Sequence, residues 1–341
     1  MIKEAIIRAM NNEDLLYHEA EAVMNEIMSG AFTPVQASSF LTAMSMKGET
    51  VDEITAFAAI MRRHCLPVPR FRDAVEIVGT GGDGSDSFNI STVSAFVISA
   101  AGVPVAKHGN RAASSRCGAA DVLESLGADL TMSPERCVDM LDGIGICFLF
   151  APRFHQAMRH VAPVRREMGV RTFFNLLGPL TNPMNVDTQL LGVYDGSLSK
   201  TLAKVMMNLG IRRGMVVHGH DGLDEISLCD RTSVCEILDG KIIEYDLDPR
   251  DLGFQYCRPE DIRGGDASHN AVIMSEVLEG EKGPHRDIVL LNSAAALYIA
   301  GMSKSLQEGV SMAAEAIDDN GAAGKLASFI DMSRGGCFHH P

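Results

Sequence analysis

The segment from Gly79 to Thr92, GTGGDGSDSFNIST, is the feature that most restricts how this chain can fold. It follows a short apolar run, residues 75–78, and precedes an apolar stretch of helical character, residues 93–101. A strand, a glycine-rich turn and a helix in this order can bind an anion, because glycine lets backbone N–H groups approach closely and the helix N-terminus favours negative charge. Taken alone, the segment also fits a tight turn that only needs glycine.

A second polar turn, KHGNRAASS from Lys107 to Ser115, favours the phosphate interpretation. It also follows a short apolar run and precedes a helix-like stretch. Lys107 and Arg111 can neutralise phosphate charge, although single cations in loops are usually solvated. Two such turns in succession favour one anion site that uses both. The glycine spacing matches neither the Walker pattern nor G-x-G-x-x-G, which argues against a nucleotide P-loop and a Rossmann site.

The order of the apolar segments predicts an α/β fold in two domains. Residues 1–70 have helical periodicity and end in a proline-containing linker, and we expect part of 160–190 to join them. Residues 71–341 alternate strand and helix patterns, which predicts a mainly parallel central sheet flanked by helices. The expected parallel strands are residues 75–78, 103–106, 146–150, 189–194 and 214–218. An antiparallel hairpin is expected over 233–247, with Asp239-Gly240 as its turn.

Composition and charge narrow the function further. A net charge of −14 at pH 7 argues against general nucleic-acid binding, which requires a basic surface. The sequence has no apolar run of about 18 residues and no apolar N-terminal segment, so neither a membrane span nor a signal peptide is expected. Eight cysteines are scattered singly without a C-x-x-C pair, which predicts reduced thiols and a cytoplasmic protein.

Four motifs together resemble those of the anthranilate phosphoribosyltransferase family. The two polar turns are followed by NLLGPLTNP at 175–183 and GLDEIS at 222–227, in that family's order and spacing. The resemblance runs from the N-terminus to about residue 330. It implies that the chain transfers the phosphoribosyl group of phosphoribosyl pyrophosphate (PRPP) to the amine of anthranilate and releases pyrophosphate, in tryptophan biosynthesis.

The resemblance also implies where PRPP binds. In the first turn the contacts fall on Gly79, Gly82, Asp83, Ser87, Asn89, Ile90, Ser91 and Thr92. In the second turn they fall on Lys107, His108, Gly109, Asn110, Arg111, Ala112, Ala113, Ser114 and Ser115. The sequence departs from the family at Ser87, where threonine is usual, and at Cys117 and Ala119, where serine is frequent. We therefore assign no diphosphate contact to Cys117 or Ala119.

For the second substrate, the resemblance places the anthranilate carboxylate on Arg165, whose planar guanidinium can form two parallel hydrogen bonds. Arg165 lies in a segment dense in cations, any one of which could instead be surface charge, and Arg171 is an alternative partner for the carboxylate. The resemblance implies further contacts with anthranilate at Gly79, Asn110, His155 and Pro179.

Adjacent carboxylates at Asp224 and Glu225 follow a strand in a glycine-containing loop. An exposed acidic loop is the alternative, but acids brought together opposite a diphosphate are best explained by a bound cation. We predict Mg²⁺ here, with Ser91, Asp224 and Glu225 as the metal-binding residues and Asp221 as a weaker candidate.

The implied reaction needs little acid–base catalysis, because the aromatic amine is already neutral at pH 7, and no residue is assigned as acid or base. Two alternatives remain. A pyrimidine-nucleoside phosphorylase of similar fold has no use for the acidic pair, and a diverged nucleic-acid-binding relative is opposed by the acidic charge. The resemblance also implies a homodimer formed through the N-terminal helical domain.

Overall fold

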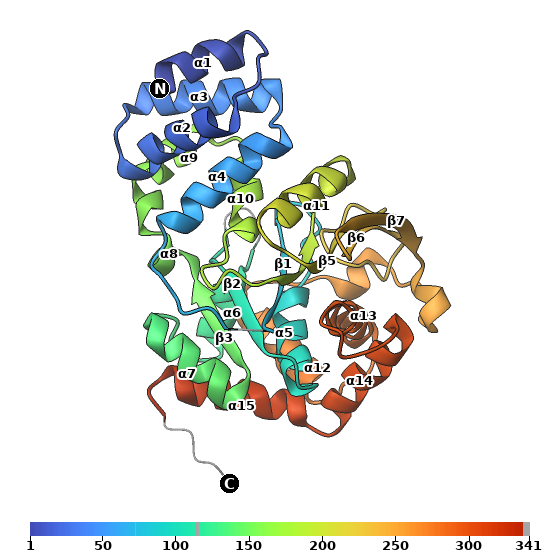
Figure 1. Ribbon diagram of the computed structural model, residues 1–341. Helices are drawn as coiled ribbons and strands as arrows, with labels where there is room; N and C mark the ends of the chain where they lie inside the picture. The colour runs from blue at the N-terminus through green and yellow to red at the C-terminus, as the bar shows by residue number, and fades with distance from the viewer. Residues whose placement is uncertain (72, 113–115, 337–341) are drawn as a thin grey trace.

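A helical N-terminal domain stands on a larger α/β domain (Figure 1). The computed structural model describes residues 1–71, 73–112 and 116–336. The first four helices are α1 (Ile2–Met10), α2 (Tyr17–Ser29), α3 (Pro34–Lys47) and α4 (Val51–Arg63). The hydroxyls of Thr33 and Thr50 accept hydrogen bonds from the backbone N–H groups of Gln36 and Glu53, so α3 and α4 begin with side-chain caps.

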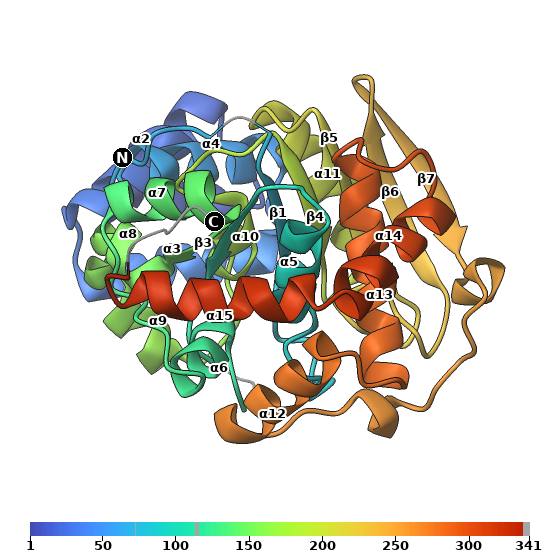
Figure 2. The ribbon, with the colours of Figure 1, turned by 90° about the horizontal axis from the view of Figure 1, so that it is seen from below.

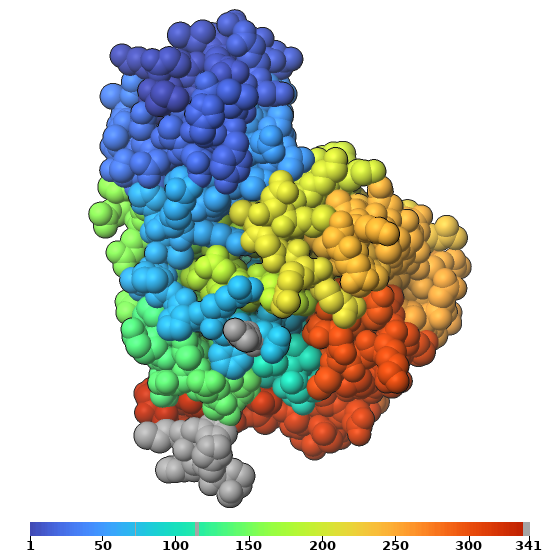
Figure 3. Space-filling model, viewed as in Figure 1, coloured from blue at the N-terminus to red at the C-terminus, as the bar shows by residue number. Residues whose placement is uncertain are grey.

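Four short helices from the middle of the chain, α8 (Ala151–Phe154), η1 (Gln156–His160), α9 (Ala162–Met168) and α10 (Phe174–Leu180), connect the two parts. η1 packs against α2, α9 against α3 and α10 against α4. Phe173 stacks on Phe57 with ring centroids 4.4 Å apart and meets Phe40 edge-on at 6.0 Å. This aromatic cluster fixes the later segment to the N-terminal helices. Figure 3 shows the N-terminal residues, in blue, rising above the α/β domain.

The α/β domain is built on a seven-stranded sheet of order β3-β2-β1-β4-β5-β6-β7. Five strands are parallel: β1 (Val75–Gly79), β2 (Val105–Gly109), β3 (Ile146–Phe150), β4 (Thr188–Gly192) and β5 (Arg213–Gly219). β6 (Thr232–Leu238) and β7 (Lys241–Leu247) form an antiparallel hairpin at one edge. The prediction of a mainly parallel sheet with an antiparallel hairpin is confirmed.

Two details of the strands follow from local chemistry. Asp239 and Gly240 have φ values of 50° and 72°, the positive values that a type I′ turn requires. β2 begins two residues later than the apolar pattern predicts, because Pro104 has no N–H to donate, and it continues through Lys107 to Gly109.

Helices cover both faces of the sheet, which explains why its strands are apolar runs without alternation. One face packs against α5 (Ile90–Ala100), α13 (Pro284–Ile299) and α15 (Gly321–Ser333). Figure 2 shows α15 passing beneath α5, with α12 (Ala267–Leu278) and α14 (Leu306–Asp318) around them. On the other face α11 (Ser199–Asn208) lies between β5 and α4. The remaining helices are α6 (Ala119–Ser125), α7 (Pro134–Ile144), η2 (Gly196–Leu198), η3 (Pro249–Leu252) and η4 (Pro259–Ile262).

The topology brings the polar motifs to one edge of the sheet. The glycine-rich turn begins at the last residue of β1, the second polar turn begins in the last three residues of β2 and the acidic loop follows β5, so all three lie at the carboxyl ends of parallel strands. The strand order reverses between β1 and β4, and ligands of open parallel sheets bind at such a point. No helix within the described residues is both long enough and apolar enough to cross a membrane.

Candidate active site

Two glycines allow the acidic loop to lie directly over the sheet edge. Gly79 and Gly192 are register partners at the ends of β1 and β4. A Cβ atom at Gly79 would lie closer than 3.0 Å to the Asp224 carboxylate, and one at Gly192 would come within 3.0 Å of the Asp224 backbone carbonyl. The sequence gives no signal for Gly192, which lies inside the expected strand 189–194.

The acidic pair is buried and faces the glycine-rich turn. Asp224 and Glu225 are 8% and 7% exposed. The Gly81 N–H donates to Asp224 Oδ2 at 2.6 Å, and Asp83 Oδ2 lies 3.5 Å from the Asp224 backbone nitrogen. Burial raises the pKa of Asp224 well above its usual range, and the nearby charges of Asp83 and Glu225 raise it further. An exposed acidic loop does not describe this arrangement.

Burial also raises the pKa of Glu225, to about 7, although Lys107 and hydrogen bonds from the Ser91 side chain and backbone favour its charged form. Carboxylates held in this way are costly to ionise together without a cation. Within the described residues no group of three or more His, Cys, Asp or Glu side chains is placed to hold a metal ion. Mg²⁺ typically takes one or two carboxylates together with substrate phosphates and waters, so Asp224, Glu225 and the Ser91 hydroxyl fit it.

Lys107 is not a surface cation. Its side chain is 3% exposed, and its Nζ donates to the Ile77 carbonyl at 2.8 Å and to Ser91 Oγ at 3.2 Å. Burial lowers the pKa of Lys107 to about 8, while the carboxylates of Glu225 and Glu76 favour its charged form. The buried side chains of Lys107 and Glu225 both contact the half-buried Ser91, so the three form one polar cluster at the end of the glycine-rich turn.

The rest of the glycine-rich turn is held by its neighbours. Gly81, Gly82 and Gly84 have φ values of 70°, 77° and 76°, which disfavour other residues. Ser87 forms an isolated antiparallel β-bridge with Arg263 through the backbone, and the side-chain amide of Asn89 donates to the Cys117 carbonyl at 3.1 Å. Ile90 and Thr92 lie in the first turn of α5, with 1% exposure each.

The second polar turn is more exposed. Asn110 and Arg111 lie at the surface, and the Arg111 guanidinium pairs with Glu124 of α6 at 2.7 Å. The Ala112 N–H donates to Asp121 Oδ2 at 2.8 Å. The structure places Lys107 against Ser91 of the glycine-rich turn, whereas the His108 N–H donates to the Glu76 carboxylate of β1 at 3.3 Å. Arg111 forms its ion pair with α6, the helix that follows the second turn. The predicted contacts at Ala113, Ser114 and Ser115 lie outside the described residues.

Two buried histidines lie together at this edge. The rings of His108 and His155 have centroids 5.1 Å apart, and both side chains are buried. Burial lowers the pKa of His155 to about 4 and lowers that of His108 well below its usual range, so both rings are neutral at pH 7. The Nε2 atom of each has no hydrogen-bond partner among the described residues, which leaves a polar atom available on each ring.

Two arginines differ in how the structure places them. Arg165, on α9, lies over the Phe174 ring at 4.9 Å, and its guanidinium has no ion pair or hydrogen bond within the described chain. Arg171 donates to the Gly82 carbonyl and stacks on the Tyr194 ring at 4.4 Å, so it contacts the glycine-rich turn directly. The Pro179 carbonyl accepts a hydrogen bond from the Gln189 side chain of β4 at 2.7 Å.

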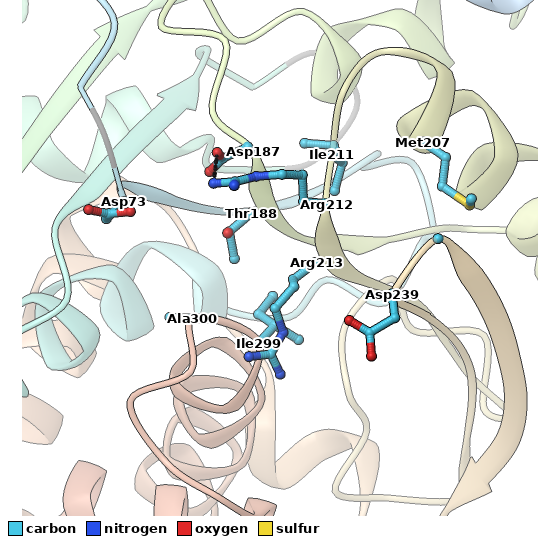
Figure 4. Close-up of a pocket in the computed structure, with 11 residues that line it drawn as sticks. Asp73, Asp187, Thr188, Met207, Ile211, Arg212, Arg213, Asp239, Ile299 and Ala300 are labelled. Carbon is cyan, nitrogen blue, oxygen red and sulfur yellow. Dashed lines mark hydrogen bonds and ion pairs between the residues drawn. The ribbon is translucent and has the colours of Figure 1, made fainter.

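A pocket of about 620 Å³ lies at the opposite edge of the sheet, where β4 and β5 begin (Figure 4). It is lined by Asp73, Asp187, Thr188, Met207, Ile211, Arg212, Arg213, Asp239, Gly240, Ile299 and Ala300. Arg212 is paired with Asp187, and Arg213 donates to the Tyr298 carbonyl at 3.2 Å. These cations are engaged by protein groups and lie at the amino ends of the strands, so we assign the active site to the carboxyl edge.

Comparison with known proteins matches both parts of the chain. Residues 3–65 match the family model described as "Glycosyl transferase family, helical bundle domain", and residues 72–324 match "Glycosyl transferase family, a/b domain". Anthranilate phosphoribosyltransferase of Methanobrevibacter smithii is 54% identical over 333 residues, which cover 98% of this chain and 99% of that protein.

Similar solved structures carry the same enzyme name as the sequence relative. The enzyme of that name from Thermus thermophilus is 45% identical, with a TM-score of 0.92 over 97% of this chain and 99% of that one. The Saccharomyces cerevisiae enzyme, in complex with PRPP and Mg, is 31% identical, with a TM-score of 0.85 over 93% of this chain and 92% of that one. With these identities over nearly its whole length, the chain belongs to the anthranilate phosphoribosyltransferase family.

Proposed function

We propose that this enzyme transfers the phosphoribosyl group of PRPP to the amine of anthranilate, giving N-(5-phosphoribosyl)anthranilate and pyrophosphate, as a step of tryptophan biosynthesis. The observation that carries the proposal is the buried Asp224–Glu225 pair packed against the glycine-rich turn at the point where the strand order reverses. The yeast relative solved with PRPP and Mg supports both the donor substrate and the metal.

In this proposal the diphosphate of PRPP binds the backbone N–H groups of the glycine-rich turn and the first turn of α5. Asp224, Glu225 and Ser91 hold Mg²⁺, which supplies positive charge to the leaving pyrophosphate. The charge of Lys107 favours the ionised form of Glu225 and adds a cation next to Ser91. Bond breaking at C1 of the ribose needs a stabilised leaving group and a well-placed amine, so positioning and electrostatics carry the reaction.

For the acceptor, we propose that anthranilate binds on the helical side of the same edge, with its carboxylate on Arg165. Support comes from the guanidinium of Arg165, which has no acidic partner in the described chain, and from the unpartnered Nε2 atoms of His108 and His155. Because both histidines are neutral at pH 7, they shape and hydrogen-bond the pocket rather than attract the carboxylate by charge.

A product assay with alternative substrates tests this function. The purified enzyme is incubated with PRPP, Mg²⁺ and a panel of aminobenzoates, and in parallel with pyrimidine nucleosides and phosphate. We expect equimolar phosphoribosylanthranilate and pyrophosphate only in the presence of Mg²⁺. Phosphorolysis of a nucleoside without turnover of PRPP would instead support the phosphorylase alternative.

We further propose a division into a helical domain of residues 1–70, joined by part of 160–190, and a PRPP-binding domain of residues 71–341. A homodimer through the helical domain is supported by exposed apolar side chains on α1 and α3, among them Met10 at 74% and Met46 at 84% exposure. The acidic charge of −14 supports an enzyme that does not bind nucleic acid, and the singly scattered cysteines, predicted to be reduced thiols, support a cytoplasmic location.

Replacing Lys107 with alanine tests the buried cation. The Michaelis constant for PRPP should rise by roughly tenfold or more, because a charge-assisted contact is lost and Glu225 loses a neighbouring charge that favours its ionised form. The constant for anthranilate should change little. Steady-state kinetics with each substrate varied in turn measure both. A rise confined to the anthranilate constant would place the diphosphate away from Lys107.

Replacing Arg165 with alanine tests the acceptor site. If its guanidinium binds the anthranilate carboxylate, kcat/KM for anthranilate should fall roughly ten- to a hundredfold, corresponding to about 1.5–3 kcal/mol. Lysine should restore only part of the loss, because it lacks the planar pair of donors.

Aniline is the matched control, since it has the amine without the carboxylate. It should be a poor acceptor for the wild-type enzyme and should lose little more in the Arg165→Ala variant. Equal losses for anthranilate and aniline would mean that Arg165 is structural. The carboxylate site would then be sought at Asn110, His155 or Arg171, of which Arg171 is the one in contact with the glycine-rich turn.

A further inference from the structure

Two of the singly scattered cysteines meet in the folded chain. The Sγ atoms of Cys229 and Cys257 lie 3.5 Å apart, although 28 positions separate them in the sequence. Both residues are half-buried free thiols, so a small molecule in solution can reach them. A disulfide has an S–S distance of about 2.05 Å, so the two sulfurs need to approach by only about 1.5 Å to form one.

The pair is connected to the acidic loop on one side. Cys229 lies four positions after Glu225. Its backbone N–H donates to Ser227 Oγ at 2.9 Å, and Ser227 Oγ donates in turn to Asp221 Oδ2 at 2.8 Å. A displacement of Cys229 is therefore passed directly into the loop that holds Asp224 and Glu225.

On the other side the pair is connected to the glycine-rich turn. The Cys257 N–H donates to the Leu228 carbonyl at 3.2 Å, which already ties its segment to the acidic loop. A few residues later, the Ile262 carbonyl accepts from the Phe88 N–H at 3.3 Å, and the Gly264 N–H donates to the Asp86 carbonyl at 2.8 Å. The segment that carries Cys257 thus also supports the turn proposed to bind PRPP.

We propose that Cys229 and Cys257 are a redox-sensitive thiol pair, oxidised to a disulfide by small-molecule disulfides, and that this crosslink restrains the acidic loop and raises the Mg²⁺ requirement of the enzyme. The effect on Mg²⁺ rests on the proposed function, whereas formation of the crosslink does not.

The chemistry is thiol–disulfide exchange in two steps. The Cys257 thiolate attacks one sulfur of the small disulfide, breaks its S–S bond and releases one small thiolate. The Cys229 thiolate then attacks the Cys257 sulfur of this mixed disulfide, forms the Cys229–Cys257 bond and releases the second thiolate. The two released thiolates take up the two protons given up by the cysteines, so the protein loses two electrons and the small disulfide gains them.

Burial raises the pKa of both thiols, and the hydrogen bond from Cys229 favours the thiolate of Cys257, which makes Cys257 the attacking group. Because the thiolate is the attacking form and the raised pKa values reduce its fraction, the exchange is followed over hours at mildly alkaline pH. The native protein is incubated with oxidised glutathione, and intact mass and peptide mapping are recorded. We expect the loss of two hydrogen atoms and a crosslinked peptide pair containing Cys229 and Cys257, both reversed by dithiothreitol.

Two variants sharpen the test. In Cys229→Ser the second step is impossible, so Cys257 should retain one glutathione and no crosslink should form. Cys65→Ser removes another half-buried free thiol, far from this pair in the sequence, and should leave the crosslink unchanged. A stable glutathione adduct on wild-type Cys257, or no reaction at either residue, would overturn the thiol pair.

The functional effect is read from the Mg²⁺ concentration for half-maximal activity. It should rise several-fold in the crosslinked enzyme, return to its starting value with dithiothreitol and stay constant in oxidant-treated Cys229→Ser. A crosslinked enzyme with an unchanged Mg²⁺ requirement would overturn the coupling to the acidic loop. If the reduced enzyme makes no product at all, the proposed function fails while the mass measurement of the crosslink still stands.

Discussion

Replacing Asp224 with asparagine and Glu225 with glutamine together is expected to lower turnover about a thousandfold or more without unfolding the protein. The substitutions keep the shape of both side chains but remove the charge proposed to hold Mg²⁺ against the leaving pyrophosphate. Steady-state product formation at saturating PRPP and anthranilate measures the loss. The matched control is Glu244→Gln with Asp246→Asn on the exposed strand β7, which removes the same charge and should leave turnover unchanged.

The same variant should be more stable than the wild type when metal is absent. The pKa of Glu225 is about 7 in the folded protein against an ordinary value of 4.5, so the folded state holds its proton over a wider pH range than the unfolded chain. Wild-type stability therefore falls as pH rises from about 4.5 to about 7, by on the order of 3 kcal/mol from this group. Glutamine does not titrate, so metal-free thermal unfolding should show the variant's advantage at pH 8 and lose it at pH 4. An advantage of equal size at both pH values would contradict the burial of a charged pair.

A second large effect is expected from a single methyl group at Gly192. In Gly192→Ala the new Cβ would lie closer than 3.0 Å to the backbone carbonyl of Asp224, which is not the flexible end of a side chain, so the loop or the strand must shift. We expect destabilisation of about 3 kcal/mol. Turnover should fall by about a hundredfold, because a misplacement of roughly 1 Å is enough for such a loss.

Gly324→Ala is the control for this substitution. Gly324 lies in α15 with no atom within 4 Å of its added Cβ, and alanine favours a helix, so stability and activity should be unchanged or slightly raised. Unfolding curves and kinetics of both variants are compared. If Gly192→Ala is as stable and active as Gly324→Ala, the close contact between β4 and the acidic loop is wrong.

The sequence predicted the parts of this fold in which local chemistry and tertiary structure agree. Residues 1–70 are helical as their periodicity predicts, with Thr33 and Thr50 capping two of the helices, and the Asp239-Gly240 turn joins two strands, because in each case neighbouring residues alone satisfy the backbone. The buried parallel strands were also recognisable, since both of their faces are covered and their residues are apolar without alternation.

What the sequence could not provide were contacts between distant segments. In the sequence Gly192 is an ordinary strand residue, and only the structure shows how closely the acidic loop packs over it. In the sequence Arg171 is one of several cations in its segment, and only the structure shows its hydrogen bond to the Gly82 carbonyl. Likewise, the spacing of Cys229 and Cys257 matches no motif, and only the folded chain places their sulfurs together. The contact at Gly192 depends on how β1, β4 and β5 are ordered in the sheet, and the other two depend on how distant loops pack, neither of which periodicity specifies.

We propose that Asp224 and Glu225 bind PRPP through Mg²⁺ at the carboxyl edge of the sheet, and equilibrium binding of PRPP tests this role most directly. Calorimetric titrations are run on the wild type and on the Asp224→Asn, Glu225→Gln variant, each with Mg²⁺ and with a chelator. The wild type should bind PRPP at least about tenfold more tightly with Mg²⁺. The variant should bind with the same weak affinity in both conditions. A variant that keeps the wild-type dependence on Mg²⁺ would contradict the claim and place the metal elsewhere.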